Sequence, residues 1–197
     1  MNVQRFKEKL GILPELIYFD ENDYLREKTN DPEKIQELIV EAMQLLEESD
    51  EENHYFLYGT IGNLLRVSEQ PTEAIHYLTL CLDDATEEKD TEREVITLIR
   101  LGEAYKYNEQ FERAFNCFDK ALYVCETHEI DTYKDFALQH KGKCLMEVEK
   151  YAEAKECFLR ALEIRTDKKE RTLMNSTLQA ITFVKGLMNK EDHKEEK

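Results

Sequence analysis

The sequence has no tryptophan, no Cys-x-x-Cys pair and no apolar stretch of about 18 residues. Without such a stretch, and without a cleavable N-terminal signal, we expect no membrane partner and a cytoplasmic location. Runs that alternate apolar and polar residues, and turns typical of strands, are absent as well. We therefore expect a fold without β-sheet.

Basic residues are scarce, with 27 Lys and Arg against 43 Asp and Glu and a net charge of −16. This balance argues against nucleic-acid binding, which requires a basic surface for the phosphates. The five cysteines and five histidines show no metal-ligand spacing. No phosphate loop, nucleophile elbow or zinc motif is present. We predict a protein that is not an enzyme and has no metal, cofactor or disulfide.

What the chain does contain is a repeat. Three glycines lie 40 residues apart, and residues around them recur at the same spacing. The recurring sets are Gly62, Gly102, Gly142; Ala74, Ala114, Ala154; Leu78, Phe118, Phe158; and Cys81, Ala121, Ala161. A fixed period of this size marks stacked units that bury a continuous core together.

Each unit is predicted to be a pair of amphipathic helices. In the second unit, apolar residues fall three and four apart through the segments around Gly102 and around Phe118. Glycine and alanine at helix crossings let two backbones approach closely, and the aromatic side chains fill the space between neighbouring pairs.

These offsets resemble the tetratricopeptide repeat. The second unit matches it with Leu101-Gly102, Tyr105, Ala114, Phe118 and Ala121, and Leu98 stands where the family has tryptophan. The resemblance covers roughly residues 51–166. It implies an all-α, right-handed superhelical solenoid of antiparallel helix pairs. The 40-residue period is similar to the long repeats of kinesin light chains, Pins-type adaptors and bacterial Rap and PlcR peptide sensors.

The repeat phase divides the chain into parts. We expect an N-terminal helical cap over residues 1–50, three repeats and a C-terminal capping helix over 167–188. The repeats are 51–90, 91–130 and 131–166. Residues 189–197 have no apolar anchor and are expected to be a disordered tail.

The resemblance also implies where a partner binds, because the first helix of each pair lines the concave groove in this family. The positions carried over contain a predicted basic strip with two polar neighbours. The predicted groove residues are Asn63, Arg66, Arg100, Lys106, His140 and Lys143. A basic groove on an acidic molecule favours a peptide or protein segment that is acidic or ends in a carboxylate.

Three functions remain open at this stage. The first is a non-enzymatic protein-protein interaction module that binds such a segment in the groove. The second is a regulatory sensor in which a peptide or effector changes the shape of the superhelix. The third is a self-association scaffold. The sequence does not decide the oligomeric state.

Overall fold

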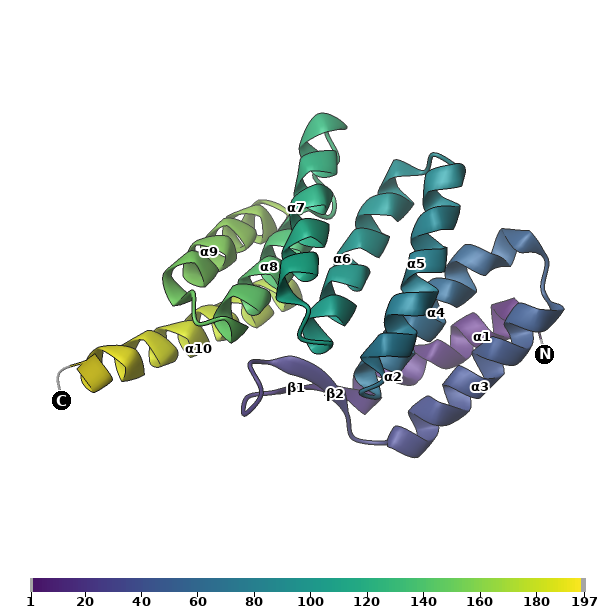
Figure 1. The fold of residues 1–197 in the computed structure, drawn as a ribbon, viewed down its shortest axis with the longest axis horizontal. Helices are drawn as coiled ribbons and strands as arrows, with labels where there is room; N and C mark the ends of the chain where they lie inside the picture. Colours follow the sequence, from purple (N-terminus) through teal and green to yellow (C-terminus); the bar gives the residue numbers. More distant parts are fainter. Residues whose placement is uncertain (1, 196–197) are drawn as a thin grey trace.

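The computed structural model describes residues 2–195 and shows a row of helix pairs (Figure 1). Helix α4 (His54–Val67) pairs with α5 (Pro71–Glu87), α6 (Thr91–Tyr107) with α7 (Phe111–Thr127), and α8 (Lys134–Glu147) with α9 (Tyr151–Asp167). Consecutive helices pack against one another along the row. The all-α class and the repeat solenoid are therefore confirmed.

The repeating glycines lie where two helices of a pair touch. A Cβ added to Gly102 would lie 2.6 Å from Cε1 of Phe118, and one added to Gly142 would lie 2.6 Å from Cε1 of Phe158. Both phenylalanines are fully buried. The glycine is therefore required because the ring of the paired helix occupies the space of its missing side chain.

The helix reversals repeat every 20 residues and do not use glycine. Each places a charged residue in the left-handed region, with φ between 55° and 61°. At the first reversal Gln70 N donates to Leu65 O at 2.9 Å and Glu69 N donates to Arg66 O at 3.2 Å, the bonds of a Schellman motif. The residues in this conformation are Glu69, Lys89, Glu109, Glu129, Glu149 and Lys169.

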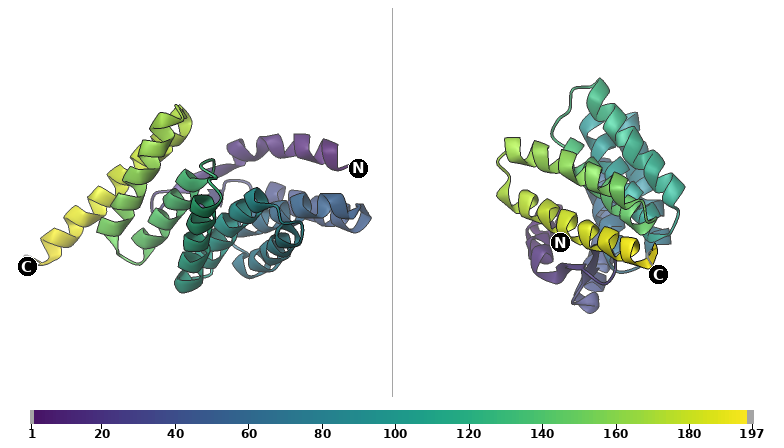
Figure 2. Two further views of the ribbon diagram at one scale, coloured as in Figure 1. Left: turned by 90° about the horizontal axis from the view of Figure 1, so that it is seen from above. Right: turned by 90° about the vertical axis from the view of Figure 1, so that its left-hand side faces the viewer.

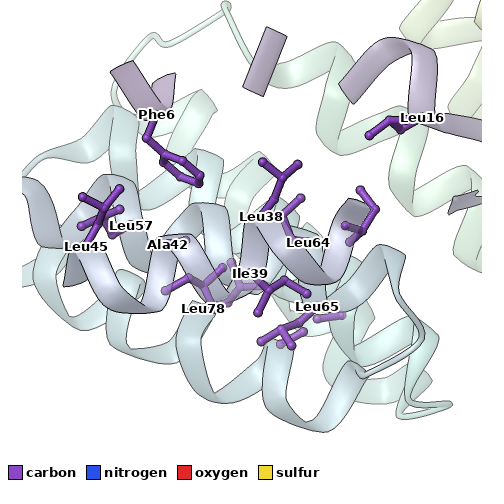
Figure 3. Close-up of a cluster of buried hydrophobic side chains, with 14 of the residues drawn as sticks. Phe6, Leu16, Leu38, Ile39, Ala42, Leu45, Leu57, Leu64, Leu65 and Leu78 are labelled. Atoms are coloured by element: carbon purple, nitrogen blue, oxygen red, sulfur yellow. The ribbon is translucent and has the colours of Figure 1, made fainter. Parts of the chain in front are cut away.

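The N-terminal part packs on the first pair through α1 (Val3–Lys9), η1 (Leu10–Ile12), α2 (Leu13–Leu16), α3 (Pro32–Glu48) and η2 (Glu51–Asn53). Helix α3 begins where Asp31 caps it by accepting from Lys34 N, followed by Pro32 in the first turn. Phe6 of α1 is fully buried in a cluster with Leu38 of α3 and Leu57 of α4 (Figure 3).

Between α2 and α3 lies a β-hairpin, so the expectation of a purely helical cap without β-sheet is wrong. Strand β1 (Ile17–Asp20) pairs antiparallel with β2 (Arg26–Thr29), with Phe19 opposite Glu27. An isolated two-stranded hairpin is marginally stable in water, so it depends on its contacts with the helices. Leu25, next to β2, supplies one by packing in the cluster formed by α8, α9 and α10.

The C-terminal part differs from expectation as well. Helix α10 (Arg171–Glu195) packs on α9 and continues through residues expected to belong to a disordered tail. It buries Ala180 and Val184 against the last repeat. The end of the expected tail, residues 196–197, lies outside the described residues.

Candidate functional site

The inner face of the solenoid is formed by α4, α6 and α8, and the hairpin covers part of it. The N-terminal segment runs along one side of the array (Figure 2, left). The hydroxyl of Tyr107, at the end of α6, accepts from Glu27 N at 2.6 Å and donates to Glu27 O at 3.2 Å. Burial raises the pKa of Tyr107 to about 12, so this hydroxyl keeps its proton at neutral pH. Strand β2 is thereby fixed to the inner face through its backbone.

Arg66 of α4 lies beneath the hairpin and is 4% exposed. Its guanidinium forms an ion pair with Glu27 of β2 and donates to Asn63 Oδ1 at 2.8 Å. Glu103 of α6 is 3.8 Å away on its other side. Arg66 is therefore surrounded by groups of its own chain.

Lys106 of α6 is fully buried in the same region. Its Nζ lies 2.9 Å from Glu103 Oε1 and 3.5 Å from Glu147 Oε1. Glu147 in turn accepts from Nε of Arg26 in β2 at 3.1 Å. We refer to Arg26, Glu27, Arg66, Glu103, Lys106 and Glu147 as the charged cluster.

Two carboxylates of the charged cluster, those of Glu27 and Glu103, stay ionised. Burial by itself would raise the pKa of Glu27, but Arg66 and Lys143 reverse this effect and the pKa lies below its usual value. For Glu103, Lys106, His140 and Arg66 together outweigh the effect of burial, and the pKa lies well below the usual value. The cations in the cluster are therefore neutralised internally.

Lys143 of α8 is buried beside the cluster. It donates to Leu25 O at 3.0 Å, and its Nζ lies 4.1 Å from the centre of the Phe19 ring. Burial and the neighbouring charge of Lys106 lower its pKa to about 8. Lys143 thus binds the hairpin and is not free to bind a partner.

Next to the hairpin the inner face remains open as a cavity of about 790 Å³. It is lined by the N-terminal segment, including the hairpin, and by residues of α4, α6, α8 and the start of α10. Most of the lining side chains are apolar. These apolar residues are Leu13, Pro14, Ile17, Phe19, Ile96, Ile99, Tyr133 and Phe136. We call this space the open cavity.

Arg100 is the cation that distinguishes the open cavity from the covered region. It is half-buried, and its Nη1 would lie 2.9 Å from a Cβ on Gly59 of α4. Among the described residues it forms no ion pair. His140 lies nearby in the cavity wall with Nδ1 3.1 Å from Glu103 Oε1. The cavity therefore offers one guanidinium without an ion pair beside a group of apolar side chains.

The six predicted groove residues thus separate into two groups. Asn63, Arg66, Arg100 and His140 line the open cavity, whereas Lys106 and Lys143 are buried outside it. A continuous basic strip is absent, because acids and the hairpin occupy it. Ile17 and Phe19 of the hairpin also line the cavity and were not among the predicted residues, although the run of apolar and aromatic residues around them was an available signal.

Sequence comparison supports the repeat assignment independently. The model of the tetratricopeptide repeat family matches residues 96–128 and 137–168, which lie in α6–α7 and α8–α9. Two copies of the tetratricopeptide repeat (TPR) are thus present, and the chain has a TPR-type solenoid fold. No curated protein sequence matches the TPR chain significantly.

Solved TPR structures share its fold. A Rap protein complexed with competence and sporulation factor gives a TM-score of 0.69 at 18% identity, covering 83% of this chain and 46% of the Rap chain. The apo form of RapI gives a TM-score of 0.66 at 20% identity, covering 82% of this chain and 59% of the RapI chain. Bacillus thuringiensis PlcR, in complex with the peptide PapR7 and DNA, gives a TM-score of 0.66 at 14% identity, covering 73% of this chain and 53% of the PlcR chain.

The expected resemblance to long-repeat Rap and PlcR proteins is confirmed at the level of fold. The TPR chain spans about half the length of these structures. Within the described residues no helix is long and apolar enough to cross a membrane. His, Cys, Asp and Glu side chains form no group of three that could hold a metal within that same part.

Proposed function

We propose that this TPR protein is a non-enzymatic interaction module that binds a peptide segment in the open cavity. The observation that carries the proposal is the unpaired guanidinium of Arg100 within an apolar space of about 790 Å³. Sites that bind ligands combine apolar walls with a few polar groups that fix orientation. Ile96, Ile99 and Phe136 supply such walls.

The charge of the cavity favours an acidic partner. Glu27 and Glu103 also line it, but both are paired with cations of the charged cluster. Arg100 therefore remains to pair with a carboxylate, either an acidic side chain or a C-terminal carboxylate. Guanidinium presents a planar set of donors that matches a carboxylate.

Two of the structural relatives support a peptide ligand, since PlcR is in complex with the peptide PapR7 and Rap with competence and sporulation factor. One of these structures also contains DNA. For this chain we propose no nucleic-acid partner, because its net charge is −16. We also propose a cytoplasmic setting without a membrane partner.

The test is selection of peptides from a library of random octapeptides with free C-termini, followed by titration calorimetry of the selected peptides. Arg100→Ala should weaken binding by about 1.5–3 kcal/mol, the value of a hydrogen bond to a charged group. Arg160→Ala is the matched control, because Arg160 is exposed on α9. Equal affinities of the two variants would contradict the proposal. Lys143→Glu is unsuitable for this test, because Lys143 is buried against the hairpin.

A further inference from the structure

The backbone of β1 has an edge that faces away from β2. In an antiparallel ladder, opposed residues alternate between pairs that bond each other and pairs whose N–H and C=O point outward. Glu27 uses both groups to bond Tyr107, so it points away from β1. Phe19 is opposite Glu27, and its own N–H and C=O therefore point away from β2.

A second bond fixes the same register. Asn30 N donates to Leu16 O at 3.0 Å, so Leu16 faces the β2 side and Ile17 faces outward. The N–H of Ile17 is occupied by Leu13 O in the last turn of α2. The outward edge of β1 thus presents the C=O of Ile17 and both backbone groups of Phe19.

This edge lies toward the open cavity. The hairpin crosses the inner face, and successive β2 residues reach successive helices: Glu27 contacts α4 and α6, and Arg26 contacts α8 at Glu147. Phe19 of β1 contacts α8 at Lys143, one helical turn before Glu147. Strand β1 therefore lies on the side of the helix N-termini, and both Ile17 and Phe19 line the cavity.

The spacing leaves room for one more strand. Neighbouring strands are about 4.8 Å apart, and three residues of a helix rise about 4.5 Å. Three residues toward the N-terminus of α8, Lys143 is followed by His140, and three residues toward the N-terminus of α6, Glu103 is followed by Arg100. Both residues line the open cavity, and Gly59 faces Arg100 without a side chain.

We propose that the peptide binds as an extended strand added to the free edge of β1, with a carboxylate on Arg100. This inference rests on the proposed function and specifies its mode. Alternate peptide side chains would face Ile96, Ile99 and Phe136, and the intervening ones would face outward. The proposed ligand is thus a peptide segment in extended conformation that combines apolar side chains with a carboxylate. Main-chain bonds to β1 supply affinity, and the side chains over the cavity supply selectivity.

Hydrogen exchange of the Phe19 amide tests the strand addition on the unmodified protein. A peptide selected from the octapeptide library should slow this exchange at least about tenfold at saturation. N-methylation along the peptide should weaken binding about tenfold or more at alternate positions and little at the others. A helical spacing of the sensitive positions would overturn the proposal.

Variants at Phe19 give a second measurement. Phe19→Pro removes the outward N–H, whereas Phe19→Ala keeps it, and both remove the aromatic ring. Because Phe19 does not bond β2, proline is compatible with the hairpin. Phe19→Pro should bind about tenfold more weakly than Phe19→Ala. Circular dichroism and the exchange protection of β2 amides establish that the hairpin is retained.

The outcomes separate the two proposals. If binding depends on Arg100 but the Phe19 amide exchanges at an unchanged rate and N-methylation shows no alternation, strand addition is wrong and cavity binding stands. If no selected peptide depends on Arg100, both proposals are wrong.

Discussion

The inner face has two halves that share the same helices and differ in their charge pairing. Near the C-terminal ends of α4, α6 and α8, buried cations and acids neutralise one another beneath the hairpin. One helical turn toward the N-terminal ends, Arg100 lies at the open cavity and forms no ion pair among the described residues. Neighbouring positions of the same helices therefore contribute to stability in one half and remain available for binding in the other. The position of the N-terminal segment determines which half of the inner face is covered and which stays open.

The most direct way to test this difference is to remove one arginine from each half. Arg66→Ala should lower the free energy of unfolding by about 3–5 kcal/mol, because it leaves the buried Glu103 and the partly buried Glu27 with less compensation. Arg100→Ala should change it by no more than about 0.5–1 kcal/mol, as expected for a half-buried residue without an ion pair. Urea denaturation of both variants measures the contrast. Similar losses would show that the two halves do not differ.

The pH dependence should reveal the burial of Lys143. Its pKa falls from 10.5 to about 8 on folding, so between these pH values the unfolded chain binds more protons and stability rises with pH. Lys143→Met lacks this dependence. The stability of the wild type relative to the variant should therefore rise by about 1.4 kcal/mol per pH unit within that window. Cysteines and Tyr107 titrate in both proteins and cancel, and a constant difference would contradict the burial.

Substitutions at two glycines should have different effects, because Gly102 faces a buried ring in the core of the repeat and Gly59 faces the guanidinium of Arg100. Gly102→Ala should lower the free energy of unfolding by about 1–3 kcal/mol, because its Cβ would meet the buried Phe118 ring at 2.6 Å. Gly59→Ala should have little effect or stabilise by up to about 1 kcal/mol, since it meets the movable end of Arg100 and favours the helix. Thermal unfolding compares the two. An equal loss in both variants would place Gly59 in the core.

Salt gives the smallest expected effect. The Debye length falls from about 10 Å at 0.1 M to about 3 Å at 1 M, so an acidic peptide on Arg100 should lose under about 1 kcal/mol of binding free energy. The charged cluster is buried and should respond less. Titration calorimetry and urea denaturation at both salt concentrations measure the two responses. A larger effect of salt on unfolding than on peptide binding would contradict the view that the charged cluster is shielded from solvent and the Arg100 site is open to it.

The repeat could be predicted because its contacts are local and periodic. Gly102 and Phe118 belong to one helix pair, and their spacing recurs in the neighbouring copies. The structure brings Asn63, Arg66, Arg100 and His140, which share this phase, to one cavity. The burial of Lys106 and Lys143 depends on the hairpin, and their positions within the repeat carry no sign of it.

The hairpin escaped prediction for a physical reason. Its strands have four residues each, and its turn combines Asn22 with Tyr24 and Leu25 at positive φ in place of an Asn-Gly pair. Its stability comes from partners far along the chain, such as Glu147 for Arg26. Local sequence contains no information about a contact of this kind. The acidic and apolar residues around it are equally compatible with a helical cap.

The hairpin also changes the order in which the molecule can be completed. Arg26 bonds Glu147 across 121 residues of chain, whereas each helix pair closes within 40 residues. A ribosome adds about 5–20 residues per second, so the hairpin waits about 6–24 s for its furthest charged-cluster partner to be synthesised. During that interval Leu25, which is buried in the finished fold, has no cluster of α8, α9 and α10 to pack into. The segment made early is thus among the last to reach its native contacts, and a nascent chain is where a strand-binding chaperone would find it.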